Sequence, residues 1–288
     1  MSRNYLKYMI IPVFIMLIVF TACQNPDPGI QADLPVSTET TFTTETVAIT
    51  ETATHPSTTS IHPETKISEV PEIIEIPESI LLEDVPYYSQ EDILPTGCEI
   101  ISAKMLLEFY THQETELDEM LSVIPCQYPK EENHRLYAPH PENAFIGNPR
   151  NESSFGCFAP VIVKMLNHLL PDAYQAVDTS GTDLQELAET YLPQNTPVLV
   201  WATIGMWNPF PNVSWYLYNE KGYPTDHEFQ WLANEHCMVL IGYDADYYYF
   251  QDPYESNGTM KFRKDISGKR YEEIGCYSVI VTEKRQKG

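Results

Sequence analysis

Residues 95–110 read PTGCEIISAKMLLEFY, and the cysteine in this stretch decides the fold and the chemistry that follow. Apolar residues recur every three or four positions after Cys98, which predicts an amphipathic helix over residues 98–110. The Pro-Thr-Gly sequence before the cysteine stops any earlier element. Unpaired N–H groups and a partial positive charge at a helix start favour a thiolate there. The stretch alone leaves two interpretations open: a small hydrophobe packed in the core, or a reactive thiol.

The remaining pattern predicts helices before strands. Residues 81–90 begin the ordered part as an extended segment, residues 159–170 form a second helix, and Thr182 caps a third. Residues 126–156 are rich in Pro, Asn and Gly, which is typical of a long loop. Strands with β-branched and aromatic residues follow at residues 198–204, 237–244, 247–253 and 278–283. Helices first and antiparallel strands later predict one α+β domain over residues 81–288.

A nucleophilic thiol needs a base within hydrogen-bond reach and a third group that orients the base. His236 begins one apolar strand, and Asp252 follows the end of the next strand. If these strands form a hairpin that turns near residues 244–246, both side chains lie at the same edge of the sheet. Asp244 and Asp246 are competing orienters, but they lie at the turn itself. We therefore predict that His236 and Asp252 end at one edge, as the candidate base and orienter for the cysteine.

Three stretches also resemble the C39-like peptidase family, a papain-like group. DVPYYSQEDILPTGCEIISAKMLLEFY (84–110) is similar to the opening strand, turn and helix of that family, and NEHCMVLIGYDADYYYFQDP (234–253) is similar to its later hairpin. ENAFIGNPRNESSFGCFAPVIVKMLN (142–167) is similar to the central part of its secreted members. The resemblance covers residues 85–281. It implies a papain-like α+β fold in which an N-terminal helical part packs on an antiparallel β-sheet.

The resemblance also implies roles for single residues: Cys98 as the nucleophile, His236 as the base and Asp252 as its orienter. It further implies that Gln90 is an oxyanion-hole donor beside the backbone N–H of Cys98. The implied function is that of a cysteine peptidase, a thiol-dependent hydrolase of amide bonds in a peptide or protein substrate. Two alternatives stay open: a non-catalytic binding or adhesion module on the same fold, and a cell-wall amide hydrolase or transpeptidase.

The same reading sets expectations for cofactors and assembly. The histidines lack metal-ligand spacing and the cysteines form no C-x-x-C pair, so we expect neither a metal site nor a cofactor. We expect a monomer.

Residues 1–22 have the pattern of an export signal. Arg3 and Lys7 precede an apolar run at residues 9–20, which is shorter than the ~20 residues of a membrane-spanning helix. The small residues before Cys23 resemble a bacterial lipoprotein signal, which implies cleavage and lipidation at Cys23. An uncleaved N-terminal anchor is the alternative. Both interpretations predict a protein attached to the membrane outside the cytoplasm, on a bacterial cell surface of the Gram-positive type.

Residues 23–80 change sharply in composition. They are rich in Thr, Ser, Glu and Pro and have no apolar period, which predicts a disordered stalk. The whole chain has a net charge of −24 at pH 7. This acidic balance argues against nucleic acid as a partner, because binding to nucleic acid needs a basic surface.

Overall fold

The structure, a computed structural model, describes residues 76–219, 221–254 and 258–284. The helices are α1 (Cys98–Thr111), α2 (Leu117–Val123), α3 (Ala159–Leu169), α4 (Leu184–Tyr191) and α5 (Lys264–Ile274), with short 3-10 turns at Leu192–Gln194 and Ile204–Met206. The strands are β1 (Ile80–Leu81), β2 (Cys126–Gln127), β3 (Lys130–Glu132), β4 (Arg135–Ala138), β5 (Phe145–Ile146), β6 (Tyr174–Asp178), β7 (Val198–Thr203), β8 (Phe210–Tyr218), β9 (Pro224–Ala233), β10 (Glu235–Tyr243), β11 (Tyr247–Gln251), β12 (Thr259–Arg263) and β13 (Ser278–Glu283). The predicted signal peptide, Cys23 and the stalk up to residue 75 lie outside the described residues and stay predictions.

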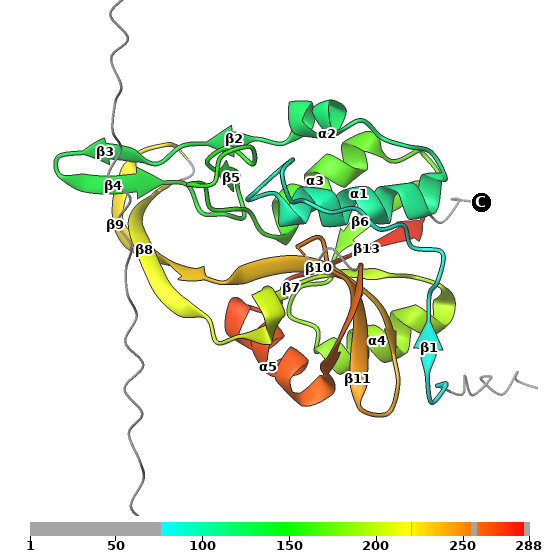
Figure 1. Ribbon diagram of the computed structural model, residues 1–288. Helices are drawn as coiled ribbons and strands as arrows, with labels where there is room; N and C mark the ends of the chain where they lie inside the picture. The colour runs from blue at the N-terminus through cyan, green and yellow to red at the C-terminus, as the bar shows by residue number, and fades with distance from the viewer. Residues whose placement is uncertain (1–75, 220, 255–257, 285–288) are drawn as a thin grey trace, which may run out of the picture. The chain divides into compact units, whose positions relative to one another are not determined.

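A seven-stranded sheet forms the centre of the fold. Its strand order is β12-β11-β10-β7-β13-β6, with β1 added beside β10, and every pairing in it is antiparallel. Helices α1 and α3 cover one face of this sheet, and α4 and α5 cover the other (Figure 1). A second sheet, β3-β4-β8-β9, extends from one end of it. The predicted α+β class, with N-terminal helices packed on an antiparallel sheet, is confirmed.

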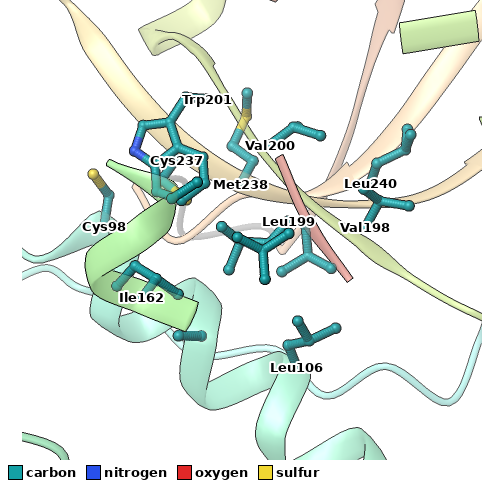
Figure 2. Close-up of a cluster of buried hydrophobic side chains, with 14 of the residues drawn as sticks. Cys98, Leu106, Ile162, Val198, Leu199, Val200, Trp201, Cys237, Met238 and Leu240 are labelled. Carbon is teal, nitrogen blue, oxygen red and sulfur yellow. The ribbon is translucent and has the colours of Figure 1, made fainter. Parts of the chain in front are cut away.

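The core lies between α1, α3 and the two central strands. All six residues of β7 are buried, and so are eight of the nine residues of β10. Figure 2 shows Leu106 of α1 and Ile162 of α3 on the side where Leu199 of β7 lies. Each side chain of this size contributes about 1.5–3 kcal/mol when it is fully buried. The two central strands are therefore held on both sides, and the residues at their ends have fixed positions.

The predicted hairpin is present as β10 and β11. The side chain of Asp244 accepts hydrogen bonds from the backbone N–H groups of Asp246 and Tyr247 at 2.8 and 2.7 Å, which closes the turn. Asp244 also accepts a hydrogen bond from the Tyr249 hydroxyl at 2.7 Å. The Asp244 carboxylate therefore stabilises the turn. This agrees with the sequence argument, which ranked Asp244 below Asp252 as the group that orients His236.

The extended segment predicted at residues 81–90 has the strand-like start that was expected, but the strand is short. Only Ile80 and Leu81 form a strand, because later residues bond singly to separate partners and form no ladder. The carbonyl of Val85 accepts a hydrogen bond from the Gln251 side chain, and the N–H of Gln90 donates to the Pro253 carbonyl. These contacts fasten the segment across the end of β11.

Three further features differ from the sequence predictions. Asp183, not Thr182, caps α4, because the Asp183 side chain accepts the N–H groups of Gln185 and Glu186. Helix α5 was not predicted: its sequence KDISGKRYEEI carries charges on most turns and buries only four residues. The predicted loop at residues 126–156 contains the short strands β2 to β5.

The first described residues lie beside the C-terminal end of β10, whereas His236 lies at the N-terminal end of that strand. Strand β1 pairs with Gly242 and Tyr243, and the Tyr243 hydroxyl donates to the Pro77 carbonyl at 3.0 Å. Residues 76–81 therefore do not cover the predicted catalytic residues. Among the described residues, no helix is both long and apolar enough to cross a membrane.

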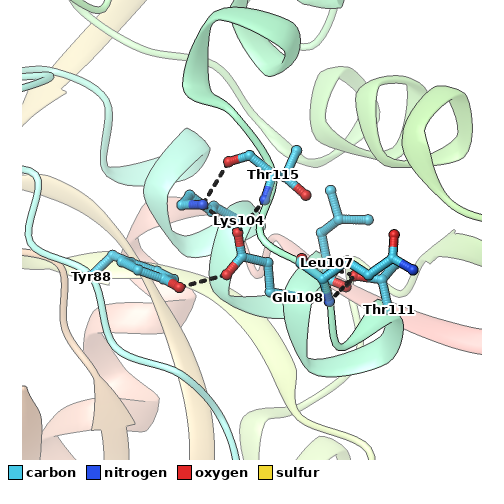
Figure 3. Close-up of polar contacts among 7 residues, drawn as sticks. Tyr88, Lys104, Leu107, Glu108, Thr111 and Thr115 are labelled. Atoms are coloured by element: carbon cyan, nitrogen blue, oxygen red, sulfur yellow. Dashed lines mark hydrogen bonds and ion pairs between the residues drawn. The ribbon is translucent and has the colours of Figure 1, made fainter.

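A buried ion pair within α1 is bonded to Tyr88 at the start of the domain (Figure 3). The Lys104 ammonium contacts the Glu108 carboxylate one turn later, and both side chains are 7% exposed. Glu108 also accepts hydrogen bonds from the Tyr88 hydroxyl at 2.6 Å and the Thr115 N–H at 2.7 Å. Burial alone raises the pKa of Glu108, but the hydrogen bonds from Lys104 and Tyr88 outweigh it and lower the pKa. The hydrogen bond to Glu108, together with burial, raises the pKa of Tyr88 to about 12.

We predict that Glu108→Gln lowers the free energy of unfolding by about 3 kcal/mol at pH 7, because it leaves a buried ammonium without its anion. The loss should shrink as pH falls below about 4, since a carboxyl with a lowered folded pKa stabilises only above its unfolded pKa. Denaturant unfolding followed by tryptophan fluorescence measures both effects. Glu119→Gln, at an exposed position on α2, is the matched control and should change stability by less than about 0.5 kcal/mol. Equal stability of the two variants would refute the prediction.

Candidate functional site

Cys98 is the first residue of α1 and is 6% exposed. It belongs to the same buried cluster as Trp201 and Cys237, which are partners on β7 and β10 (Figure 2). The turn before it is tight, because a Cβ added to Gly97 would come within 2.6 Å of the Leu94 Cβ. The loop and the helix start are therefore packed into one fixed position.

His236 and Asp252 meet where the hairpin argument predicted. The His236 Nε2 lies 2.6 Å from the Asp252 Oδ1, and each residue is 1% exposed. When Nε2 carries the hydrogen of this bond, Nδ1 is left as the basic nitrogen. The Asp252 Oδ1 also accepts the Tyr254 N–H at 3.0 Å, which fixes the carboxylate. The catalytic roles of both residues stay predictions.

A sharp bend at Asn234 brings this histidine to its position. Strand β9 of the smaller sheet ends at Ala233 and β10 of the central sheet starts at Glu235, so one residue makes the passage between sheets. Asn234 has a left-handed backbone with φ 68°, a conformation that asparagine tolerates better than most residues. Its carbonyl accepts the Ile204 N–H at 2.9 Å, which ties the bend to the end of β7.

Two glutamates surround the Cys98 sulfur. The thiol donates to the Glu99 Oε2 at 3.4 Å, and the Glu99 Oε1 accepts the Cys157 N–H at 2.7 Å. The Cys98 sulfur and one carboxylate oxygen from each of Glu99 and Glu235 lie within 4.8 Å of one another. Glu99 is fully buried, and a Cβ on Gly156 would come within 2.2 Å of its carboxylate. The thiol therefore faces acidic groups at close range.

These surroundings favour the neutral thiol. Burial, followed by the charges of Glu99 and Glu235, raises the pKa of Cys98 well above its usual value, while a hydrogen bond from the Cys237 backbone works against this. Burial raises the pKa of Glu99 to about 7. Burial and the nearby Glu99 raise the pKa of Glu235 as well. The thiolate expected from the helix start is not favoured here, because desolvation and two carboxyl groups oppose it.

Gln90 is buried close to the same turn. Its Nε2 donates to the Pro95 carbonyl at 3.1 Å, and its own N–H donates to the Pro253 carbonyl, next to Asp252. Its Oε1 is buried without a hydrogen-bond partner among the described residues. An amide nitrogen carries two N–H donors, so one remains for a further acceptor. The oxyanion-hole role of Gln90 stays a prediction.

Sequence reasoning missed Glu99 and Glu235. A glutamate in the first turn of a helix is usually interpreted as an exposed charge that favours the helix. A glutamate at the start of a strand belongs to no sequence motif that would mark it as part of a site. The available signal was their position, since each is the sequence neighbour of a predicted catalytic residue. The five described cysteines are free, and Cys126 is exposed while Cys157 is buried, so these two form no disulfide.

Two cavities differ in their relation to this site. A large cavity of about 850 Å³ lies between β3, β8 and the loop around His140, and none of the predicted catalytic residues lines it. A smaller cavity of about 190 Å³ is lined by Glu235 and by aromatic side chains. Only the smaller of these two reaches the surroundings of the thiol.

Comparisons with known proteins bear on the fold and the family of this chain. The chain is 24% identical over 203 residues to the uncharacterized protein YvpB of Bacillus subtilis (strain 168), which covers 69% of this chain and 74% of that protein. The crystal structure of a candidate C39-like peptidase from Bacillus anthracis superposes with a TM-score of 0.61 and 22% identity, covering 72% of this chain and 99% of that one. The predicted papain-like α+β fold is confirmed by this likeness.

Residues 82–279 match the family model described as the Peptidase_C39 like family, and this match spans more than half of the chain. The matched range includes the cysteine turn, the central loop and the hairpin on which the sequence resemblance rested. The chain therefore belongs to the Peptidase_C39 like family.

Proposed function

We propose that this protein is a cysteine peptidase that cleaves amide bonds through Cys98, His236 and Asp252. The observation that carries the proposal is the buried hydrogen bond between His236 and Asp252 at 2.6 Å. It orients an imidazole whose sequence neighbours on both sides, Glu235 and Cys237, lie against the Cys98 thiol. An oriented base whose strand neighbours reach a cysteine at a helix start supports the pairing of thiol and base that nucleophilic catalysis needs.

The reaction is an acyl transfer. The Nδ1 of His236 takes the thiol proton as the Cys98 sulfur attacks the substrate carbonyl, and Asp252 stabilises the imidazolium that forms. The imidazolium then gives this proton to the leaving amine as the C–N bond breaks. Water, deprotonated by His236, attacks the thioester and releases the acid, which restores the thiol.

Hydrogen-bond donors near Cys98 support the oxyanion step. The backbone N–H of Cys98 is at the start of α1 and lacks a partner within the helix, and Gln90 has a second amide N–H. Each such donor typically contributes about 10²–10³ in rate when it is aimed at the developing oxyanion. The unpaired Gln90 Oε1 is consistent with a side chain held for its donors.

We expect the wild-type chain to cleave peptides and Cys98→Ala to lose at least about 10³ in rate, because the nucleophile is removed. Incubation with a mixed peptide library followed by mass spectrometry measures this. Cys126→Ala, which removes an exposed thiol outside the site, is the matched control and should keep the activity. Absence of cleavage by the wild type would favour the non-catalytic binding module, and equal cleavage by Cys98→Ala would assign the chemistry to other residues.

A second prediction concerns Glu99. Because the Glu99 charge helps to raise the pKa of Cys98, Glu99→Gln should lower that pKa and shift the rate of Cys98 alkylation toward lower pH. A glutamine keeps an oxygen that accepts the Cys157 N–H, so the local fold is retained. Iodoacetamide labelling from pH 5 to pH 9, quantified by peptide mass, gives the profile for wild type and variant.

The direction of the Glu99→Gln shift separates two roles. Faster alkylation near pH 7 means that Glu99 holds the thiol neutral while His236 is the base. Slower alkylation would contradict this account, since it would make the Glu99 carboxylate, with its pKa of about 7, the group that takes the thiol proton. Glu119→Gln again serves as the control and should leave the profile unchanged.

A further inference from the structure

The smaller cavity beside the thiol has aromatic walls and one carboxyl group. Phe158 stacks on Tyr277 with ring centroids 4.2 Å apart and on Trp231 at 5.8 Å, and all three residues line the cavity. The Tyr277 hydroxyl donates to Glu142 at 2.7 Å, which holds that ring in place. A volume of about 190 Å³ is below the range typical of whole-ligand pockets, so the cavity suits a single long side chain.

Glu235 supplies the carboxyl group of this cavity. Its Oε1 is buried and has no hydrogen-bond partner among the described residues. Its carboxylate and that of Glu99 lie within 4.8 Å of each other and of the Cys98 sulfur. Two carboxyl groups at this separation cannot both ionise without a nearby positive charge. A positive charge bound there would allow both groups to ionise, and the exposed Gln230 at the border opens the cavity to solvent.

We propose that this cavity binds the side chain of a lysine or arginine that flanks the bond to be cleaved, with the positive head group on Glu235. The proposal rests on the proposed function and names its substrate class. The aromatic walls accept the methylene stem of a long basic side chain, and the head group pairs with the free Glu235 oxygen. An apolar side chain of equal length would leave that oxygen buried and unpaired.

A bound cation would also act on the nucleophile. Glu235 is one of the groups that hold the Cys98 thiol neutral. A positive head group on Glu235 offsets that charge, so the correct substrate promotes thiolate formation at the moment it occupies the site. The net charge of −24 favours encounter with basic peptides in addition.

The test compares peptide pairs that differ only by lysine or norleucine at each position around the cleaved bond. In the wild type, lysine at one position should raise kcat/KM at least about tenfold over norleucine, with part of the effect in kcat. Glu235→Gln should reduce this ratio to about one, and Glu235→Asp should restore part of it. Each ratio compares two peptides on the same variant, so a general effect of the substitution on the reactivity of the Cys98 thiol cancels. Glu228→Gln, at an exposed position on β9, is the matched control and should keep the wild-type ratio.

Binding to Cys98→Ser, measured by fluorescence anisotropy with the same peptides, separates this proposal from the proposed function. A lysine preference in binding that Glu235→Gln abolishes supports the cavity even if the wild type cleaves nothing. A ratio near one in the wild type, or an unchanged lysine preference in Glu235→Gln, overturns the proposal. Tight Zn²⁺ binding that is lost in both Cys98→Ser and Glu235→Gln also overturns it, since the three groups would then form a metal site.

Discussion

The hydrogen bond between His236 and Asp252 is the contact on which the rest of the site depends. It forms only because β10 and β11 make a hairpin whose turn is closed by Asp244, so that the start of one strand and the end of the other meet. The central sheet holds both strands, and the bend at Asn234 sets the direction in which β10 enters it. A change in any of these three features would disturb the pairing of His236 with Asp252.

In the absence of substrate, the electrostatics of the site oppose ionisation of the Cys98 thiol. A cysteine at a helix start is normally helped toward the thiolate, yet burial and the carboxyl groups of Glu99 and Glu235 favour the thiol. Such a site costs stability unless the acidic groups gain partners when substrate binds. The orphaned oxygen of Glu235 and the carboxyl of Glu99 make the site responsive to positive charge. Reactivity and substrate choice would then depend on the same pair of carboxyl groups.

The sequence was informative where local pattern and chain direction determine structure. The hairpin and the pairing of His236 with Asp252 followed from chain direction and turn residues. The helix after Cys98 was also predicted, but its expected amphipathic pattern was wrong, because residues 98–109 of α1 are all buried. Helix α5 was missed because its charged sequence has little helical pattern, and it is stabilised by packing against β7. The sequence could not show how residues 82–90 are held, because their single hydrogen bonds to distant strands leave no sequence signature.

The acidic surroundings of the thiol could not be predicted for a similar reason. Glu99 and Glu235 are far apart in the chain, and only the packing of α1 against β10 brings their carboxyl groups together. The same holds for Gly156, whose missing side chain leaves room for the Glu99 carboxylate. Single-sequence patterns report local preferences, whereas the pKa of a buried group depends on neighbours from several elements.

Site mapping of a covalent inhibitor tests the central claim most directly. One equivalent of a peptidyl chloromethyl ketone is reacted with the protein at pH 7, and the modified cysteine is identified by peptide mass. The account predicts modification at Cys98, at a rate that falls at least about a hundredfold in Asp252→Ala, while slow labelling of the exposed Cys126 is unchanged. Modification spread between Cys126 and Cys98, with no dependence on Asp252, would contradict it.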